Sequence, residues 1–212
     1  PGIEWTRFIT SHPRNFDREL VLAMKRNPKV CRQVHLPMQS GSTAVLKAMN
    51  RGYTRDDYLG LVNMIREEVP GIQFGTDIIV GFPGESEADF QETCDMLTRV
   101  RFASIFSFRF SPRPHSAAAK IPDDVPLAEK KRRLIVLQEL QKSIQLEINR
   151  TFIGKTVRVL CTGKSPKGAG RFAGRTSESM IVNFDSREDP TGKFAMVEIT
   201  DCGPYSLHGL RS

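Results

Sequence analysis

Small polar residues and glycines follow two short apolar runs, at Gln39-Ser40-Gly41-Ser42 and at Gly81-Phe82-Pro83-Gly84-Glu85. In a parallel α/β protein, ligands bind where strands end and helices begin. Glycines let a ligand approach the backbone closely, and the first turn of each following helix offers unpaired amides. An amide and two hydroxyls suit ribose hydroxyls or an amino-acid head group, because each of these needs donors and acceptors. The two segments together predict a nucleotide-sized site.

Each segment also has a plain structural interpretation. GFPG is the sequence of an ordinary tight turn after which Ser86 caps a helix, and QSGS is a helix start capped by Ser42. His35 precedes the first loop, where a lone histidine either serves the structure or binds a ligand. Asp77 is the one acid expected to face a barrel interior, where it either binds substrate or pairs with Arg109 or another neighbouring base. No Ser/His/Asp order, Walker loop or HExxH pattern occurs in the sequence.

Up to about residue 125, the hydrophobic pattern alternates between strand and helix. Ile78-Ile79-Val80 is apolar throughout, as expected of a parallel strand covered on both faces. Possible capping boxes, Thr54 with Asp57 and Ser86 with Asp89, begin two of the helices. The order β-α-β-α-β-α-β predicts an α/β barrel or an open doubly wound sheet. We expect strands over Trp5–Thr10, Val30–Leu36, Ile72–Phe82 and Ala103–Phe110, and helices over Phe16–Lys25, Thr43–Met49, Arg55–Glu68 and from Ser86.

A proline-rich loop, SPRPHSAAAKIPDDVP, separates these elements from a long helix predicted over Leu127 to about Arg150. From Thr151 onward, short β-like runs alternate with Gly, Ser, Pro and Asp, a rhythm that over about sixty residues predicts a small antiparallel barrel of the oligonucleotide-binding kind. We therefore expect two domains, residues 1–150 and 151–212. The strands of the second domain are predicted over Thr156–Cys161, Arg171–Arg175, Met180–Phe184 and Lys193–Ile199.

The overall composition limits the class of protein. Thirty-one lysines and arginines against twenty-four acids give a formal charge of +7, which favours an acidic partner such as nucleic acid. The four cysteines, Cys31, Cys94, Cys161 and Cys202, form no CxxC pair, which predicts free thiols in a reducing compartment. No apolar run approaches the about 20 residues needed to cross a bilayer, so no membrane partner is expected. A start without methionine, at PGIEWTRF, suggests a piece of a longer protein.

The second domain opens with a basic stretch, because residues 151–177 contain no acid. Basic side chains interleaved with an aromatic on a small β-barrel are what a phosphate backbone and a stacked base require. The alternative is an ordinary solvated face. We assign RNA contacts to Lys155, Arg158, Lys164, Lys167, Arg171, Phe172 and Arg175.

Four motifs in order, HLPMQSGS, VLKAMNRGYTRDDYL, TDIIVGFPGES and FSFRFSPRPHSAAA, resemble the radical S-adenosylmethionine (SAM) methylthiotransferases. The segment from Phe152 to Leu210 resembles the TRAM domain that closes those enzymes. The resemblance covers essentially the whole chain and implies an α/β fold, a partial (β/α) radical SAM barrel followed by a small TRAM β-barrel. HLPMQSGS with MNRGYT is most similar to the branch that acts on isopentenyl-adenosine beside the tRNA anticodon. The alternatives are the threonylcarbamoyl-adenosine branch, the ribosomal-protein branch and a non-catalytic RNA-binding module.

The resemblance also implies roles for single residues. The first loop would lie at the ribose and methionyl part of S-adenosylmethionine. The second loop, together with the end of its strand, resembles the motif GxIxGxxE. Asp77 stands where the motif has its first glycine, and the motif's glutamate comes one place later, at Glu85. The strand that follows would border the adenine. The cofactor-binding residues expected on this basis are Gln39, Ser40, Asp77, Ile79, Gly81, Glu85, Phe108 and Phe110.

The family's cluster-binding CxxxCxxC and its further N-terminal cysteines have no counterpart in this sequence. The resemblance implies that the full-length enzyme uses one 4Fe–4S cluster to cleave S-adenosylmethionine to a carbon radical, and a second to supply sulfur. Because a cluster needs convergent thiolates, we assign no metal ligand and no catalytic residue here. We expect a cytoplasmic tRNA-modifying enzyme with no stable protein partner, of which this piece alone folds and binds tRNA without methylthiolating it.

Overall fold

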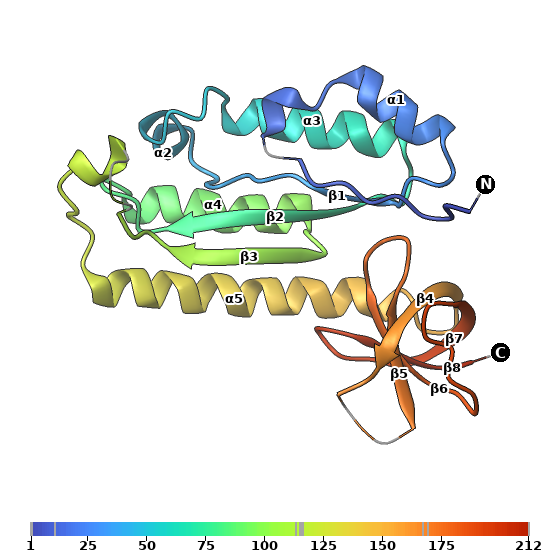
Figure 1. Ribbon diagram of the computed structural model, residues 1–212. Helices are drawn as coiled ribbons and strands as arrows, with labels where there is room; N and C mark the ends of the chain where they lie inside the picture. Colours follow the sequence, from blue (N-terminus) through green and yellow to red (C-terminus); the bar gives the residue numbers. More distant parts are fainter. Residues whose placement is uncertain are drawn as a thin grey trace. The chain divides into compact units, whose positions relative to one another are not determined.

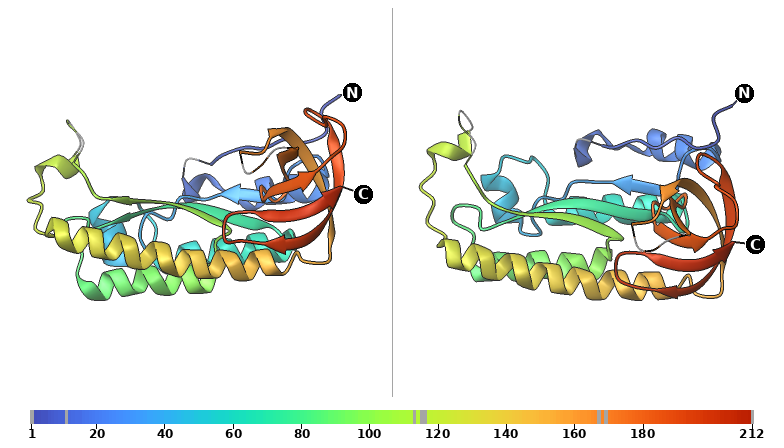
Figure 2. Two further views of the ribbon diagram at one scale, coloured as in Figure 1. Left: turned by 90° about the horizontal axis from the view of Figure 1, so that it is seen from below. Right: turned by 60° about the horizontal axis from the view of Figure 1, so that its bottom comes forward.

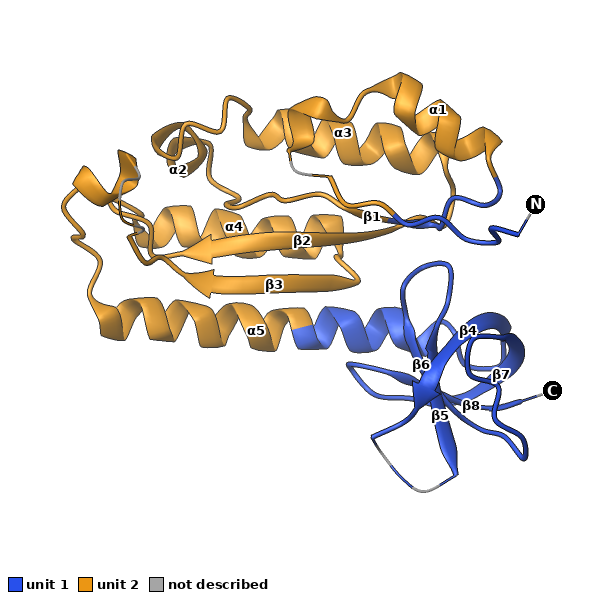
Figure 3. Cartoon of the chain, viewed as in Figure 1, with its two compact units in different colours: residues 1–7, 28–33, 142–212 blue, residues 8–27, 34–141 orange. Residues whose placement is uncertain are grey.

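A computed structural model describes residues 2–10, 12–112, 114, 117–166, 168 and 170–211. The chain divides into two compact units (Figure 3). The smaller unit contains residues 1–7, 28–33 and 142–212, and the larger contains residues 8–27 and 34–141. The long helix α5 (Leu127–Arg150) contributes residues to both units. Each unit is described by itself below.

The larger unit is built on a three-stranded sheet in the order β1-β2-β3 (Figure 1). Strands β2 and β3 are parallel, with Asp77 opposite Phe106 and Ile79 opposite Phe108. Together with the first part of α5, its elements are η1 (Pro13–Asn15), α1 (Arg18–Arg26), β1 (Gln33–His35), α2 (Thr43–Ala48), α3 (Arg55–Glu68), β2 (Gln73–Val80), α4 (Glu87–Val100), β3 (Ser104–Arg109) and η2 (Ala117–Lys120).

The two faces of this sheet differ in how much they are covered. Phe74, Ile78 and Val80 of β2 are buried at 1% exposure or less, on the face along which α4 and α5 run side by side (Figure 2). Side chains alternate along a strand, so Asp77 and Ile79 point to the opposite face. On that face β3 presents Phe106 and Phe108, which are 59% and 54% exposed. The expectation of β2 as a strand covered on both faces is therefore wrong, because one face is open.

Local sequence rules account well for the helices. Both predicted capping boxes form, Thr54 with Asp57 on α3 and Ser86 with Asp89 on α4. Helices α3 and α5 have the predicted bounds, and the other predicted helices of this unit differ by a few residues at their ends. Within the described part of the chain, no helix is both long and apolar enough to span a membrane.

The prediction of a strand over Trp5–Thr10 is wrong, because in the part of the chain that the structure describes the segment forms no continuous ladder of backbone hydrogen bonds with a neighbour. Among the described residues, its backbone pairs through one parallel bridge, between Thr6 and Val30. Further along, the hydroxyl of Thr10 donates to the carbonyl of His35, so a side chain takes the place of a backbone amide. The segment therefore runs beside its neighbour without the repeated amide bonds of a sheet.

The smaller unit contains a closed five-stranded barrel in the order β4-β5-β6-β8-β7. The predicted small barrel is confirmed, but β6 and β8 pair in parallel, and the sequence analysis missed β8. Its core consists of inward residues such as Val159, Val182, Phe184 and Val197, all at most 1% exposed. The strands are β4 (Thr156–Lys164), β5 (Arg171–Arg175), β6 (Ile181–Asp185), β7 (Phe194–Cys202) and β8 (Leu207–Arg211).

The loop after β1 packs directly on α4, and this contact generates a stability prediction. A Cβ placed on Gly41 would lie 2.5 Å from the Cα of Thr93, whereas one on Gly60 in α3 would meet nothing within 4 Å. We expect Gly41→Ala to lower the free energy of unfolding by about 1–3 kcal/mol, because backbone must move. The matched Gly60→Ala should raise it by about 0.5–1 kcal/mol through helix propensity. Urea unfolding followed by helical circular dichroism measures both, and equal effects would contradict the packing argument.

Candidate functional site

The polar loop after β1 is fixed to β2 through its backbone. Gln39 has a left-handed φ of 69°, yet its amide donates to the carbonyl of Asp77 at 2.8 Å. The amide of Ile79 in turn donates to the carbonyl of Gln39 at 2.9 Å. The backbone of Gln39 is therefore held at the carboxyl end of the sheet, where parallel α/β proteins bind ligands.

Helix α4 holds this loop through two side chains. The hydroxyl of Thr93 accepts from the amide of Gly41 at 2.9 Å and lies 3.4 Å from the Ser40 hydroxyl. The Ser42 hydroxyl donates to Asp89 at 2.5 Å instead of capping α2, so the expected Ser42 cap is wrong. Ser40 is 1% exposed and accepts from the amide of Ser42, so its hydroxyl supports the loop from inside.

The glycine-rich loop after β2 is closed by a buried ion pair. The amide of Gly81, at a φ of 72°, donates to the Glu85 carboxylate at 3.1 Å. The Arg133 guanidinium donates to the same carboxylate at 2.8 Å and to the Glu85 carbonyl at 2.9 Å. Burial raises the pKa of Glu85, while the Gly81 amide and Arg133 act in the opposite direction. Glu85 therefore shapes the loop from within, and its carboxylate is already engaged.

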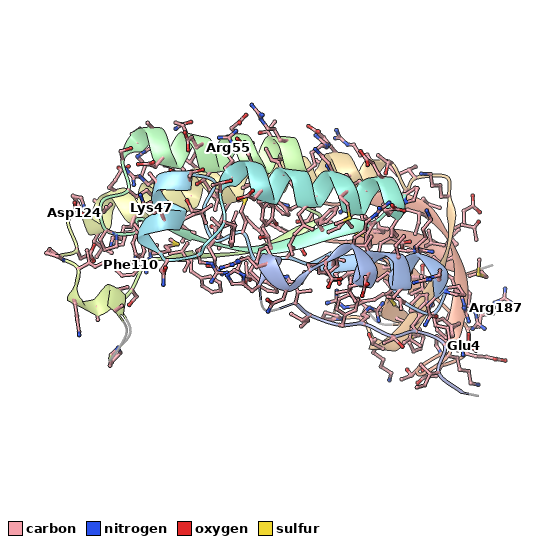
Figure 4. The ribbon with its side chains drawn as sticks, turned by 90° about the horizontal axis from the view of Figure 1, so that it is seen from above. Glu4, Lys47, Arg55, Phe110, Asp124 and Arg187 are labelled. Atoms are coloured by element: carbon pink, nitrogen blue, oxygen red, sulfur yellow. The ribbon has the colours of Figure 1, made fainter. Side chains whose placement is uncertain are left out.

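Helix α5 supports the same loop with Lys130. A Cβ on Gly81 would lie 2.4 Å from the Cγ of Lys130, so only glycine allows this close approach. The Lys130 ammonium lies 2.6 Å from Asp123 and 5.1 Å from the ring centroid of Phe110. Phe110 and Asp124 lie at the same end of the larger unit as Lys47 of α2 (Figure 4). Phe110 is thus positioned beside the loop, in contact with α5.

On the open face of the sheet, a histidine contacts an aspartate among apolar rings. The Nε2 of His35 lies 3.1 Å from the carboxylate of Asp77, and its ring centroid lies 5.8 Å from that of Phe106. Asp77 thus pairs with a neighbouring base, His35, and not with Arg109 as one alternative had it. Phe108 is exposed beside half-buried Ile79. The arrangement presents a flat apolar surface next to a carboxylate.

A basic cluster beside the first loop was missed by the sequence analysis. The hydroxyl of Tyr53 donates to the Met38 carbonyl at 2.9 Å and accepts from the Nε of Arg51 at 3.4 Å. The Nη2 of Arg51 is buried and has no hydrogen-bond partner in the described part of the chain. The pKa of His12 is lowered by burial and by the nearby charges of Arg51 and Arg14. A buried guanidinium nitrogen without a partner suits an oxyanion.

The signal for this cluster lies in a turn and not in a periodic pattern. Asn50 and Gly52 have positive φ angles of 55° and 71° on either side of Arg51. An arginine between two residues that tolerate the left-handed region marks a tight turn in the sequence NRGY. Its approach to Tyr53 and His12 depends on tertiary packing, which no local pattern contains.

The predicted RNA-binding residues do not share one environment. Phe172 is 7% exposed and packs on Phe184 inside the barrel, so its expected role as a stacking platform is not compatible with this structure. Arg158 pairs with Glu4, and Arg175 donates to the carbonyl of Ser179. Lys167 lies outside the described residues. The remaining three, Lys155, Lys164 and Arg171, are exposed.

The residues present do not fit an iron–sulfur cluster. All four cysteines are free thiols. Among the residues that the structure describes, no three His, Cys, Asp or Glu side chains converge as metal ligands. For the residues that the structure does not describe, the absence of a metal ligand stays a prediction.

Asp89 joins both loops, so its removal should loosen them together. Partial burial acts to raise the pKa of Asp89, but hydrogen bonds from Ser42 and Ser86 outweigh it and lower that pKa. We expect Asp89→Asn to lower the free energy of unfolding by about 1–2 kcal/mol at neutral pH, after allowing for solvent screening. A lowered pKa gives stability that is present above about pH 4 and lost as the pH falls further.

The matched control is Asp57→Asn, which removes a capping box with no link to another loop. Urea unfolding at a series of pH values should show a larger loss for Asp89→Asn than for Asp57→Asn. The difference between wild type and Asp89→Asn should shrink below pH 4. A difference that stays constant with pH would contradict the role of the carboxylate.

Two family models match parts of the chain. The model described as the radical SAM superfamily matches residues 2–97, and the TRAM domain model matches residues 150–210. Coproporphyrinogen III oxidase (HemN) from Escherichia coli, described as a radical SAM enzyme, matches with a TM-score of 0.55 and 14% identity. This likeness covers 82% of the chain and 46% of HemN, and at such low identity it supports the fold alone.

Relatives match the chain along almost all of its length. The tRNA-2-methylthio-N(6)-dimethylallyladenosine synthase of Acetivibrio thermocellus is 47% identical over 99% of the chain and 44% of its own length. The protein of the same name from Geotalea uraniireducens is 47% identical over 99% of the chain and 47% of its own length. The chain therefore spans about half the length of these relatives. Its residues 2–97 resemble the radical SAM superfamily and its residues 150–210 resemble the TRAM domain, and the chain is similar to these synthases along almost all of its own length.

Proposed function

We propose that the chain is part of a tRNA methylthiotransferase that acts at carbon-2 of isopentenyl-adenosine in the anticodon stem-loop. The observation that carries the proposal is the meeting of two loops and an open aromatic face at one end of a parallel sheet, in a chain that also holds a TRAM barrel. The names of the relatives support the dimethylallyl (isopentenyl) branch over the other two. A cytoplasmic site of action and functional domains of residues 1–150 and 151–212 belong to the same proposal.

The residues present fit the nucleoside of S-adenosylmethionine. Ile79 and Phe108 offer an apolar face to adenine. Phe110 follows at the end of β3, where its ring packs on Phe82 of the second loop. Gln39 and Asp77 are neighbours through their backbones at the polar edge, and an amide and a carboxylate there would supply the donors and acceptors that ribose hydroxyls need. Gly81 gives the backbone its left-handed turn at the end of β2, with the Lys130 side chain packed against it. When bound, S-adenosylmethionine would supply the carbon radical for the reaction.

Two of the expected contact residues take a different role in this proposal. Ser40 and Glu85 have their polar atoms engaged inside the loops, with Ser42 and Arg133 respectively. They hold the ligand-facing backbone in place, so we assign them as positioning residues. Removing either one is expected to alter the loops and not to delete a direct contact.

Arg51 is the residue that we add to the site. Its buried Nη2 without a partner lies beside Tyr53, whose hydroxyl is bonded to the loop at Met38. The methionyl carboxylate is the anionic group of S-adenosylmethionine, and a guanidinium is its natural partner. We therefore propose that Arg51 neutralises this carboxylate.

The described residues hold no ligand set for a 4Fe–4S cluster, so no reaction step is assigned to the chain by itself. We expect the chain to bind tRNA and to leave it unmodified in the presence of S-adenosylmethionine. Binding should weaken at least tenfold between 50 and 200 mM salt, because several phosphate contacts are broken. Filter binding at several salt concentrations measures this, and mass spectrometry of nucleosides detects modification.

The matched controls are a tRNA with threonylcarbamoyl-adenosine and a ribosomal protein. Tighter binding of either would contradict the isopentenyl-adenosine branch. Affinity that is independent of salt would contradict the electrostatic contact with the RNA backbone.

Arg51→Gln should weaken the binding of S-adenosylmethionine to the chain about 10- to 100-fold, since a charge-assisted hydrogen bond is lost. Arg55→Gln is the matched control, because Arg55 on α3 pairs with Asp95 and not with the loops. Isothermal titration calorimetry measures both variants. Equal affinities of wild type and Arg51→Gln would overturn the carboxylate role while leaving the adenine contacts intact.

A further inference from the structure

One surface of the TRAM barrel is already occupied by the chain itself. The guanidinium carbon of Arg158 on β4 lies 3.8 Å from the ring centroid of Phe194 on β7. Its Nη2 lies 3.0 Å from the carboxylate of Glu4. Trp5 meets Phe194 edge to face, with ring centroids 4.8 Å apart. An acid and an aromatic of the N-terminal segment thus fill the places that a phosphate and a base would need.

Further contacts within the same compact unit hold these segments on the barrel. Arg7 donates to the carbonyl of Thr176 at 2.6 Å, and the amide of Arg32 donates to the Ser177 hydroxyl at 2.9 Å. Arg158 is therefore a residue that fastens Glu4 and Trp5 to the barrel. Its guanidinium already has a carboxylate partner, although the sequence pattern placed it among the RNA contacts.

A different part of the barrel forms an open groove. It has a volume of about 660 Å³ and lies where the end of β6 and the following turn meet the end of β8. The volume falls in the range of about 300–1,000 Å³ that is usual for small-ligand sites. The residues that line the groove are Gly170, Asp185, Ser186, Arg187, Glu188, Leu210 and Arg211.

The charges in this groove leave two guanidiniums available. Arg211 donates to the neutral hydroxyl of Ser186 at 2.8 Å. Arg187 is exposed, and its side chain points outward (Figure 4). It has no ion pair among the residues that the structure describes. Of the two acids in the lining, Asp185 lies 3.2 Å from Arg171 and is partly neutralised by it, while Glu188 stays exposed.

Two lysines, Lys164 and Lys193, lie close enough to the turn after β6 for their charges to act on Asp189. The pKa of Asp189 is lowered by hydrogen bonds from Thr191 and further by the charges of Lys164 and Lys193. Leu210 is 55% exposed and adds an apolar surface to the groove. Guanidiniums beside an exposed apolar side chain suit a phosphodiester with its attached sugar or base.

We propose that the sugar–phosphate backbone of RNA binds in this groove, between Arg187 and Arg211, and not on the surface that Arg158 closes. The proposal rests on the proposed function, which makes tRNA the partner of the chain. It moves the RNA contact from the β4–β7 surface to the end of the barrel. The lysines and arginines near the groove then add long-range attraction.

The test is the double variant Arg187→Glu/Arg211→Glu in the whole chain. Its charge-matched control is Arg26→Glu/Lys131→Glu, in which both residues belong to the larger unit. Filter binding of tRNA at several salt concentrations is compared with thermal melting, which reports whether each variant folds. We expect the groove variant to bind at least tenfold more weakly than the control, with a salt slope reduced by about one to two.

Each outcome separates this proposal from the proposed function. Equal weakening by both variants would show an effect of overall charge and would overturn the groove. Unchanged binding by the groove variant would overturn it as well, while tRNA stays the partner. If wild type itself binds no tRNA, the proposed function fails first. Should the double variant unfold, Arg187→Gln alone, at an exposed side chain, provides the same comparison.

Discussion

The carboxylate of Asp89 is the point on which the arrangement of the site depends. It accepts from Ser86, which begins α4, and from Ser42 in the loop after β1. One side chain thus caps a helix and ties two strand ends to each other. Thr93, one turn further along α4, adds the contact with Gly41. Because both residues stand on a rigid helix, the distance between the loops is set by helix geometry and not by loop flexibility.

A second constraint is the buried ion pair of Glu85 and Arg133. Side-chain exposures of 2% and 5% mean that both charges have lost most of their water. A buried pair of this kind contributes little net stability, but leaving one partner alone costs about 3–5 kcal/mol. Its value lies in specifying one loop conformation, since Gly81 reaches the same carboxylate. The glycine-rich loop is therefore shaped by α5, an element far along the chain.

Local sequence rules predicted the helices that interactions between neighbouring residues determine. Capping boxes at Thr54 and Ser86 gave the starts of α3 and α4, and the apolar period gave α5. The errors arise where tertiary contacts decide. Trp5–Thr10 carries the composition of a strand, but Trp5 packs on the ring of Phe194 instead of extending a ladder. Phe172 stands in a basic stretch of the sequence, yet the pleat turns it into the barrel core.

The same limit applies to the charges of the barrel. Arg158 and Arg187 are the same residue type in one basic domain, and counting charge cannot distinguish them. Arg158 stacks on Phe194 and pairs with Glu4, so it has already lost part of its hydration to the protein. Arg187 keeps its water and has no acidic partner in the described residues. An RNA phosphate must compete with Glu4 for the first arginine, whereas the second has no carboxylate partner to displace in the described residues, so the groove is the surface that the proposal favours.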